Sequence, residues 1–545
     1  MQRVEKALAP LEKVVELHDT RRHKVALQVQ LEMLRYCANT SFTCFLRAMP
    51  LTATAAAARR HDELIAAAFH RLLVTEVLTQ SQRGFALAQA RLPVKMGGFG
   101  TTSQTEVSRA AVVGSWALCV EPMGRLCPQM VGRVSICGPR EELLPHLREL
   151  HDSHATLLKE HASTARRYQQ QAAPCFHCYN ATARGYLVYH PPNHSPAHTL
   201  LLFSKFDSKS TYLTTVQRRY SSIIHHSAWE TLRRQLQGVS QREVVRFIGE
   251  SQAGAGSFLN AIPSNPLFRI TTWAMRYSAH RRCGLVVSDF VGAAQCSEAM
   301  SARGMRFDTL GDVAQNGGKQ GHQSRHFATL NTLYSILQGA FGSAMQREPS
   351  GYRAYSDYRP DLACPARALG ITTAASEGLY IGDLKIFSPI PADAAETPAA
   401  GAGAGFGNTN PWARATVLGV SPATRGRKGK FNRWNGTDTV AEVRGDYHRA
   451  LQLGHEVQPL LIETMGGLSP PLMNLLRTGA RLRGNRLSAK QREQASWSMR
   501  NWLTFAVVRI SVTVRRALAE EARRAYETGI LKAGGGGGAA GCWPG

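Results

Sequence analysis

The chain has few acidic residues for its size and no long hydrophobic run. Across 545 residues, 39 Asp and Glu stand against 65 Lys and Arg, which leaves a net charge of +26. The most apolar late run, residues 502–508, is cut by Arg509 and is too short to span a bilayer. The first 30 residues mix acidic and basic groups without an apolar segment, so no secretory or transit peptide is indicated. We therefore expect a soluble protein with no membrane partner.

Cysteine is sparse and irregularly spaced. The 11 cysteines are an odd number in a large chain, which favours reduced core thiols in a reducing compartment. One cluster, Cys175, Cys178, His190 and His194, lies near the spacing of a Cys2His2 zinc finger. Prolines interrupt the interval between the two histidines, where a finger needs a helix. A surface loop with incidental Cys and His is favoured there, and zinc binding is the alternative.

The excess of positive charge indicates which kinds of partner the protein attracts. Basic charge on this scale attracts phosphate polyanions through counterion release, and it would also attract an acidic membrane surface or an acidic protein. Arginine is spread along the whole chain, which favours an extended footprint on nucleic acid. The length allows two to four domains, and 43% apolar residues argues against wholesale disorder.

One pair of segments carries residues suited to catalysis. Residues 378–387 alternate apolar and polar, which predicts a strand with Asp383 and Lys385 on one face. Asp361, which follows a proline, supplies a second acid, and Glu348 is a weaker third candidate. Two acids and a lysine on a sheet can hold a hard divalent cation, with the ammonium beside the attacking water or the scissile phosphate. The pattern predicts a phosphodiesterase that uses Mg2+ or Mn2+.

The same residues also have purely structural interpretations. Asp383 and Lys385 can form an ion pair on an edge strand, and Pro360-Asp361 can form a turn. Glu348, which precedes a proline, can mark the end of a helix.

The spacing of Pro360-Asp361 and Asp383-Leu384-Lys385 resembles the PD-(D/E)xK nuclease pattern. The residues on either side of the motif make the resemblance more specific. Arg325-His326 opens a helical pattern, and residues 459–467 follow the second half of the motif. This order is similar to the restriction-like endonuclease at the C-terminal end of reverse-transcriptase proteins of non-long-terminal-repeat retroelements, as found in plants, algae and protists.

The resemblance implies roles for individual residues. Asp361 and Asp383 would be Mg2+ ligands with Glu348 as a weaker third, and Lys385 would help orient or deprotonate the hydrolytic water. Arg325 and His326 match the Arg-His start of the first nuclease helix, with a structural or a functional role. Three basic residues of a loop interleaved with aromatic residues, together with Arg325, are the predicted nucleic-acid contacts: Lys428, Lys430 and Arg433.

Two further segments resemble that family. Residues 91–103 are similar to the segment that follows a reverse-transcriptase palm, although a tight turn between helices is the favoured structural interpretation of its glycines. Cys296 is where a zinc knuckle would start, but Glu298, Val313 and Asn316 stand where its other ligands are expected, so no zinc is predicted. No Asp-Asp pair occurs in the chain, so reverse-transcriptase activity is not expected. We expect the C-terminal part of a longer retroelement protein that lacks its polymerase palm.

The expected fold is α+β and multidomain, with a mainly helical N-terminal half, a restriction-endonuclease-like α/β core and a C-terminal helix. Within the core we expect a helix with Ser324 as its N-cap, then paired strands at residues 352–361 and 378–387, a helix at 440–453, a strand at 457–462 and another helix. The expected segments are helical residues 1–150, an uncertain domain 151–255, a basic helical segment 256–323, the nuclease-like domain 324–483 with a flexible insertion 391–430, an amphipathic helix 484–530 and a Gly-rich tail 531–545.

Two classes of function fit these observations. The first is a Mg2+-dependent DNA endonuclease that nicks a chromosomal target, with DNA, element RNA and a separate or upstream reverse transcriptase as partners, and with a nuclear location inferred from that role. The second is a catalytically dead, basic nucleic-acid-binding remnant of a retroelement. They differ in whether Glu348, Asp361, Asp383 and Lys385 converge in the fold.

Overall fold

The computed structural model describes residues 26–73, 78–126, 145–161, 211–287, 290–291, 294, 301, 306–315, 319–349, 359–373, 377–390, 433–434, 439–440 and 448–534. Within it the chain forms two compact units. Unit 1 comprises residues 1–24, 33–71 and 100–232, and unit 2 comprises residues 25–32, 72–99 and 233–545. The described part is mostly helical with a small mixed sheet, so the protein is α+β.

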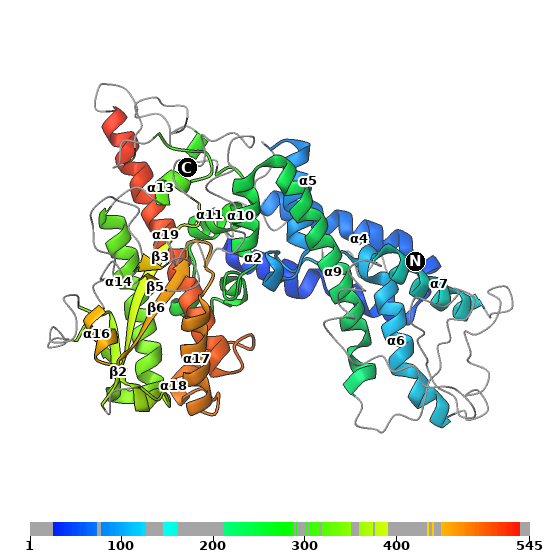
Figure 1. Ribbon diagram of the computed structural model, residues 1–545. Coiled ribbons are helices and arrows are strands. Elements are labelled where there is room, and N and C mark those ends of the chain that lie inside the picture. The colour runs from blue at the N-terminus through cyan, green and yellow to red at the C-terminus, as the bar shows by residue number, and fades with distance from the viewer. Residues whose placement is uncertain are drawn as a thin grey trace. The chain divides into compact units, whose positions relative to one another are not determined.

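Unit 1 is helical in its described part (Figure 1). Its elements are a π-helix η1 (Leu34–Ala38), α3 (Thr43–Ala48), α4 (Leu51–Leu72, with Leu72 counted in unit 2), α6 (Gln104–Leu126), α7 (Pro145–Glu160) and the first part of α9 (Thr211–Val239). An apolar cluster from α6, α7 and α9 forms a core: Ala110, Val112, Val113, Leu150, Leu157 and Ile224. Gly114 of α6 lets α9 approach closely, because a Cβ at this position would lie 2.3 Å from Cβ of Gln217.

The start of α6 is fixed by a buried acid from α4. Asp62 accepts hydrogen bonds from Ser103 Oγ at 2.6 Å and from the backbone amides of Gln104 and Thr105 at 2.8 and 3.0 Å. Burial would raise the pKa of Asp62, but hydrogen bonds from His61, Ser103 and the two amides hold it at about 2. The ionised carboxylate therefore satisfies the free amides of a helix N-terminus.

Unit 2 contains the sheet and the helices around it. Before the sheet come α2 (Leu27–Met33, with Met33 counted in unit 1), α5 (Gln80–Arg91), the 3-10 turn η2 (Val94–Met96), the end of α9, α10 (Gln241–Glu250), η6 (Ser257–Asn260), η7 (Pro266–Phe268), α11 (Thr272–Cys283) and α13 (Asp312–Gln315). The sheet region comprises α14 (Lys319–Phe341), η8 (Gly342–Ala344), β1 (Gln346–Arg347), β2 (Leu362–Pro365), η10 (Ala366–Leu369), β3 (Leu379–Phe387), α16 (His448–Gln452) and β6 (Glu456–Glu463). After it follow α17 (Pro470–Leu482), α18 (Ala489–Gln494) and α19 (Trp502–Gly534), and β4 (Arg433–Trp434) with β5 (Thr439–Val440) forms a separate two-stranded ladder.

The four-stranded sheet has the order β1-β2-β3-β6. β1 with β2 and β2 with β3 are antiparallel, whereas β3 and β6 are parallel. Their ladder runs from Tyr380 opposite Glu456 to Phe387 opposite Glu463. This mixed sheet with a helix before its first strand and another before its last matches the predicted order of elements in this region.

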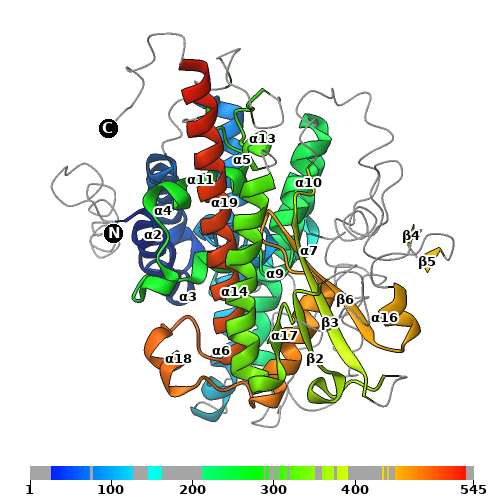
Figure 2. The same ribbon diagram turned by 90° about the vertical axis from the view of Figure 1, so that its left-hand side faces the viewer.

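Helices cover both faces of the sheet. On one face, Tyr380, Leu384 and Ile386 of β3 enter a core built with α14, α17 and α19, where Trp502 is fully buried. Figure 2 shows α14 and α19 running side by side. On the other face, Ile381 packs against Ala450 of α16. The C-terminal helix therefore contributes to the core of the sheet region, and it begins at Trp502 instead of residue 484.

Three local expectations are corrected. The first nuclease helix begins at Lys319, so Ser324 lies inside α14 and is not its N-cap. The strand paired with β3 follows Asp361, because Pro360 has no amide hydrogen to donate to a ladder. Among the described free cysteines, only Cys283 and Cys364 are buried, whereas Cys37, Cys44 and Cys119 are exposed.

Candidate functional site

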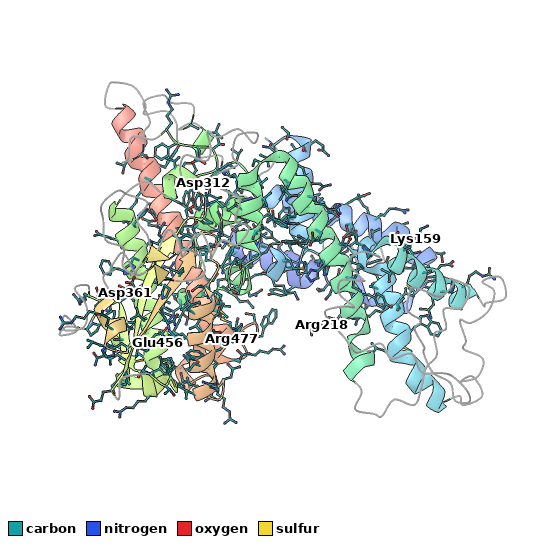
Figure 3. All side chains as sticks on the ribbon, viewed as in Figure 1. Lys159, Arg218, Asp312, Asp361, Glu456 and Arg477 are labelled. Carbon is teal, nitrogen blue, oxygen red and sulfur yellow. The ribbon has the colours of Figure 1, made fainter. Side chains whose placement is uncertain are left out.

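Asp361, the residue just before β2, lies next to Asp383 of the neighbouring strand β3. β2 begins at Leu362, whose Cα is paired with that of Gly382, so Asp361 falls in line with Asp383 one step further along the ladder. Asp361 Oδ2 accepts a hydrogen bond of 2.7 Å from the backbone amide of Leu384, the residue that follows Asp383. The structure therefore brings together the two acids that the sequence singled out. Figure 3 labels Asp361 beside the sheet.

This position of Asp361 has a local cause. The ladder between β2 and β3 ends at Leu362, which leaves the amide of Leu384 without a backbone acceptor on β2. The Asp361 carboxylate takes the place of that acceptor. The Asp361 carboxylate therefore has a structural role, which it would keep if it also bound a metal ion.

The other oxygen of Asp361 is held by α14. His326 Nε2 donates to Asp361 Oδ1 at 3.1 Å. The neighbouring residue Arg325 donates to Glu521 of α19 and to the carbonyl oxygen of Ile386 at the end of β3. Residues 325 and 326 therefore fix α14 against both strands that carry the acids.

Lys385 lies on the same face of β3 as Asp383. Tyr380, Leu384 and Ile386 point into the core on the opposite face, so by alternation the odd-numbered residues share the other face. Asp383 is 2% exposed, whereas Lys385 is partly exposed. An acid and a basic side chain therefore stand two residues apart on one face, as the period-2 pattern predicted.

Glu348 touches Asp361 through its backbone. Its amide donates to the carbonyl oxygen of Asp361 at 2.8 Å, and its φ of +40° departs from the extended conformation of β1. Its carboxylate lies 3.7 Å from Arg347 Nε and 3.9 Å from a guanidinium nitrogen of Arg359. Among the residues that the structure describes, no three His, Cys, Asp or Glu side chains form a metal-holding group. Glu348 is therefore paired with arginines and is not gathered into a three-carboxylate group.

Asp361 and Asp383 alone suit a magnesium ion. Mg2+ is commonly bound by one or two carboxylates and completes its octahedron with water and substrate phosphates. Each oxygen of Asp361 accepts one hydrogen bond here and retains further lone-pair capacity. The donor set fits a Mg2+ or Mn2+ ion that is shared between the protein and a phosphate.

A further buried acid, which no sequence motif indicates as a site residue, lies near the C-terminal ends of β3 and β6. Glu463 ends β6 opposite Phe387, and neither of its carboxylate oxygens has a hydrogen-bond partner among the described residues. It lies against Gly249 and Gly467, where a Cβ would come within 3.2 and 3.3 Å of its Oε2. Burial, and then the nearby charge of Glu250, raise the pKa of Glu463 to about 8. It therefore holds a proton at neutral pH.

Glu250 itself is the centre of a buried ionic cluster. Arg515 of α19 donates to both carboxylate oxygens at 2.9 and 2.8 Å, and Arg282 of α11 donates to one of them. Arg282 also donates to the carbonyl oxygens of Val94 and Gly98. The glycine-rich segment 91–103 therefore contains a tight turn packed on an arginine, in agreement with the structural interpretation of its glycines.

The predicted nucleic-acid contacts have different outcomes. Arg325 is 3% exposed and is engaged inside the protein, so its role is structural and it does not offer its guanidinium to nucleic acid. Arg433 lies in β4, paired with Val440. Lys428 and Lys430 lie outside the described residues.

The two predicted zinc motifs lie largely outside the described residues. All four ligands of the finger-like cluster do so: Cys175, Cys178, His190 and His194. So do Cys296, Glu298 and Asn316 of the knuckle, whereas Val313 is a buried core residue of α13.

Comparisons with protein-family models, with curated proteins and with solved structures gave no match to this chain. None of the helices in the described part combines the length and apolarity needed to cross a bilayer.

Proposed function

We propose that this chain contains a Mg2+-dependent DNA endonuclease of the restriction-like kind that is found in retroelement proteins. The observation that carries the proposal is the placement of Asp361 beside Asp383 at the β2-β3 edge, with Lys385 on the face of Asp383. The mixed sheet with helices on both faces supports the restriction-like core.

Each residue has a task in this proposal. Asp361 and Asp383 would hold the metal, which when bound supplies a Lewis acid and an activated water. Lys385 stabilises negative charge that develops on the phosphate and orients the attacking water. His326 keeps the Asp361 carboxylate in place, so it is a positioning residue.

The partners follow from the chemistry. The substrate is DNA, and a separate or upstream reverse transcriptase would extend the 3′ hydroxyl exposed at the nick while it copies element RNA. Such a nuclease works on chromosomes, so we also propose nuclear residence. Imaging of a tagged chain that showed it only outside the nucleus would contradict that part.

The test is nicking of a supercoiled plasmid by the full chain in Mg2+. We expect nicked circles with the native protein, a loss of at least a hundredfold with Asp383→Asn, and no nicking in EDTA. Glu520→Gln, which removes one exposed carboxylate from α19, is the matched control and should nick like the native protein. Equal nicking by Asp383→Asn would sink the proposed site.

One observation favours the second function, a non-catalytic nucleic-acid-binding remnant. Both carboxylate oxygens of Asp361 already accept hydrogen bonds from protein donors. These hydrogen bonds would hold the side chain in place even in a protein without nuclease activity. If the folded native chain retains plasmid DNA but nicks it in neither Mg2+ nor Mn2+, this second function replaces the first.

A further inference from the structure

The stretch from Arg477 to Arg500 is rich in positive charge. It contains seven basic residues and one acidic residue, Glu493. It covers the last turns of α17, where Figure 3 labels Arg477, and continues through α18 to the residues before α19. Six of the basic side chains are exposed: Arg477, Arg481, Arg486, Lys490, Arg492 and Arg500.

Two exposed arginines of α19 have acidic partners. Arg523 and Arg524 of α19 form ion pairs with Glu520 and Glu527. The 477–500 stretch contains one acidic residue and seven basic residues, so the electrostatic potential around it is positive. An unbalanced patch of this kind attracts polyanions.

The stretch is folded into a closed loop. Asn485 accepts hydrogen bonds from the amide of Trp502 through its carbonyl oxygen at 3.2 Å and from the amide of Leu503 through Oδ1 at 3.0 Å. Residues 486–501 therefore leave and return to the same point, as in an Ω-loop. We call these residues the basic loop.

The basic loop has its own internal order. Ser488 and Gln491 form a reciprocal capping box at the start of α18. Met499 is buried, and Ser498 Oγ donates to the carbonyl oxygen of Asn260 at 2.7 Å. The cations are therefore presented on an ordered scaffold and not on a loose tail.

An aromatic side chain stands among these cations. Trp497 is 57% exposed, although tryptophan is usually well buried in folded proteins. Arg500 Nε donates to the carbonyl oxygen of Trp497, which places a cationic side chain next to the residue that carries the indole. Exposed aromatic rings with surrounding Lys and Arg are the elements of single-strand binding, in which bases stack and phosphates are neutralised.

We propose that the basic loop, with Arg477 and Arg481 of α17, binds single-stranded nucleic acid. The cations contact the backbone phosphates, and Trp497 stacks on an unpaired base. A duplex offers the same phosphates but keeps its bases stacked internally, so the indole gains nothing from it. The surface uses no residue of the candidate active site, and binding there does not depend on nuclease activity.

The experiment measures binding of fluorescent oligo(dT), oligo(U) and a duplex of equal length to the full chain in EDTA. The loop variant is Arg486→Glu with Lys490→Glu and Arg492→Glu. The matched control reverses three exposed arginines of α19: Arg516→Glu, Arg523→Glu and Arg524→Glu. Trp497→Ala and Trp497→Phe separate stacking from charge, and thermal melting confirms that each protein is folded.

We expect either single strand to bind more tightly than the duplex. The loop variant should lose at least tenfold in affinity, with the slope of log K against log salt reduced by about 2, because each lost phosphate contact contributes about 0.7. Trp497→Ala should lose about fivefold or more on single strands, and Trp497→Phe should restore most of it. Equal losses in the loop variant and the control, or no effect of Trp497→Ala, would overturn the proposal. Tighter binding of the duplex than of the single strands would also overturn the proposal.

Discussion

Asp361 is fixed by two protein donors, one from α14 and one from β3. The His326 imidazole and the Leu384 amide each bind one of its carboxylate oxygens, so the carboxylate has one orientation. Polar partners that orient a ligand in this way commonly change metal affinity by about 10- to 100-fold when removed. The contribution of His326 can therefore be separated from that of the acids.

His326→Ala should lower the nicking rate about tenfold and raise the Mg2+ concentration that gives half of the maximal rate. His326→Gln, which retains an N–H donor, should recover part of both losses. Nicking rates measured over a Mg2+ titration check this. If the rate falls without any change in the Mg2+ requirement, His326 does not act through a metal held by Asp361.

Glu463 should make the stability of the fold depend on pH. Its pKa is about 8 in the folded chain, mainly because of burial, and a glutamate in an unfolded chain titrates near ~4.3. Between these values the unfolded chain releases a proton that the folded chain retains, so the stability is fully present below about pH 4 and is lost as the pH rises toward 8.

Glu463→Gln cannot ionise and should remove this loss. We expect the variant to gain about 3 to 4 kcal/mol relative to the native chain between pH 5 and pH 8. Urea unfolding of both proteins at the two pH values measures the difference. Parallel pH profiles of the native chain and the variant would contradict a raised pKa at Glu463.

Some of these residue placements could be predicted from the sequence and others could not. The alternation in 378–387 is a local property, and it places Asp383 and Lys385 correctly on one face. Arg325 was misplaced at a nucleic-acid surface, because its partner Glu521 lies 196 positions further along the chain. Glu463 carried no signal of its burial, since its glycine neighbours come from α10 and from the following turn.

At the level of elements, Asn485 joins the end of α17 to the start of α19. It adopts a φ of +55°, which is more tolerable for Asn than for most side chains, and its Oδ1 accepts the amide of Leu503 in the first turn of α19. The turn therefore depends on both its backbone conformation and its side chain.

Asn485→Ala should destabilise the fold by about 2 kcal/mol, because it loses the hydrogen bond to the Leu503 amide and adds left-handed strain. Asn485→Gly loses the hydrogen bond but relieves the strain, so we expect it to cost less. Urea unfolding of the three proteins measures the order. An alanine variant as stable as the native chain would show that this hydrogen bond contributes nothing.

Element boundaries were the least predictable part of the fold. The amphipathic pattern after residue 484 suggested one continuous helix, but the structure ends α18 at Gln494 and starts α19 at Trp502. The Gly484-Asn485 pair, both at positive φ, is the turn signal between α17 and the basic loop. The strand paired with β3 was expected to end at Asp361, but β2 begins at Leu362; three of its four residues are buried, and they show no alternation that would mark it as a strand.

At the level of the whole molecule, the two units interleave along the chain. Residues of α9 up to Leu232 count with unit 1, and the rest of that helix counts with unit 2. No change in composition marks such a boundary inside a helix, so contiguous domains were the natural sequence-based expectation. The net charge of +26, by contrast, follows from sequence alone, and it agrees with a polyanionic partner for both proposed activities.

The proposed nuclease requires that Asp361 and Asp383 share one metal ion. Paramagnetic resonance of Mn2+ titrated into the full chain measures whether they do. We predict one bound ion per native chain, retained in Glu520→Gln and lost in Asp361→Asn and in Asp383→Asn, with all four proteins folded by thermal melting. If both aspartate variants bind Mn2+ as the native chain does, or if the native chain binds none, the two acids are not a metal site.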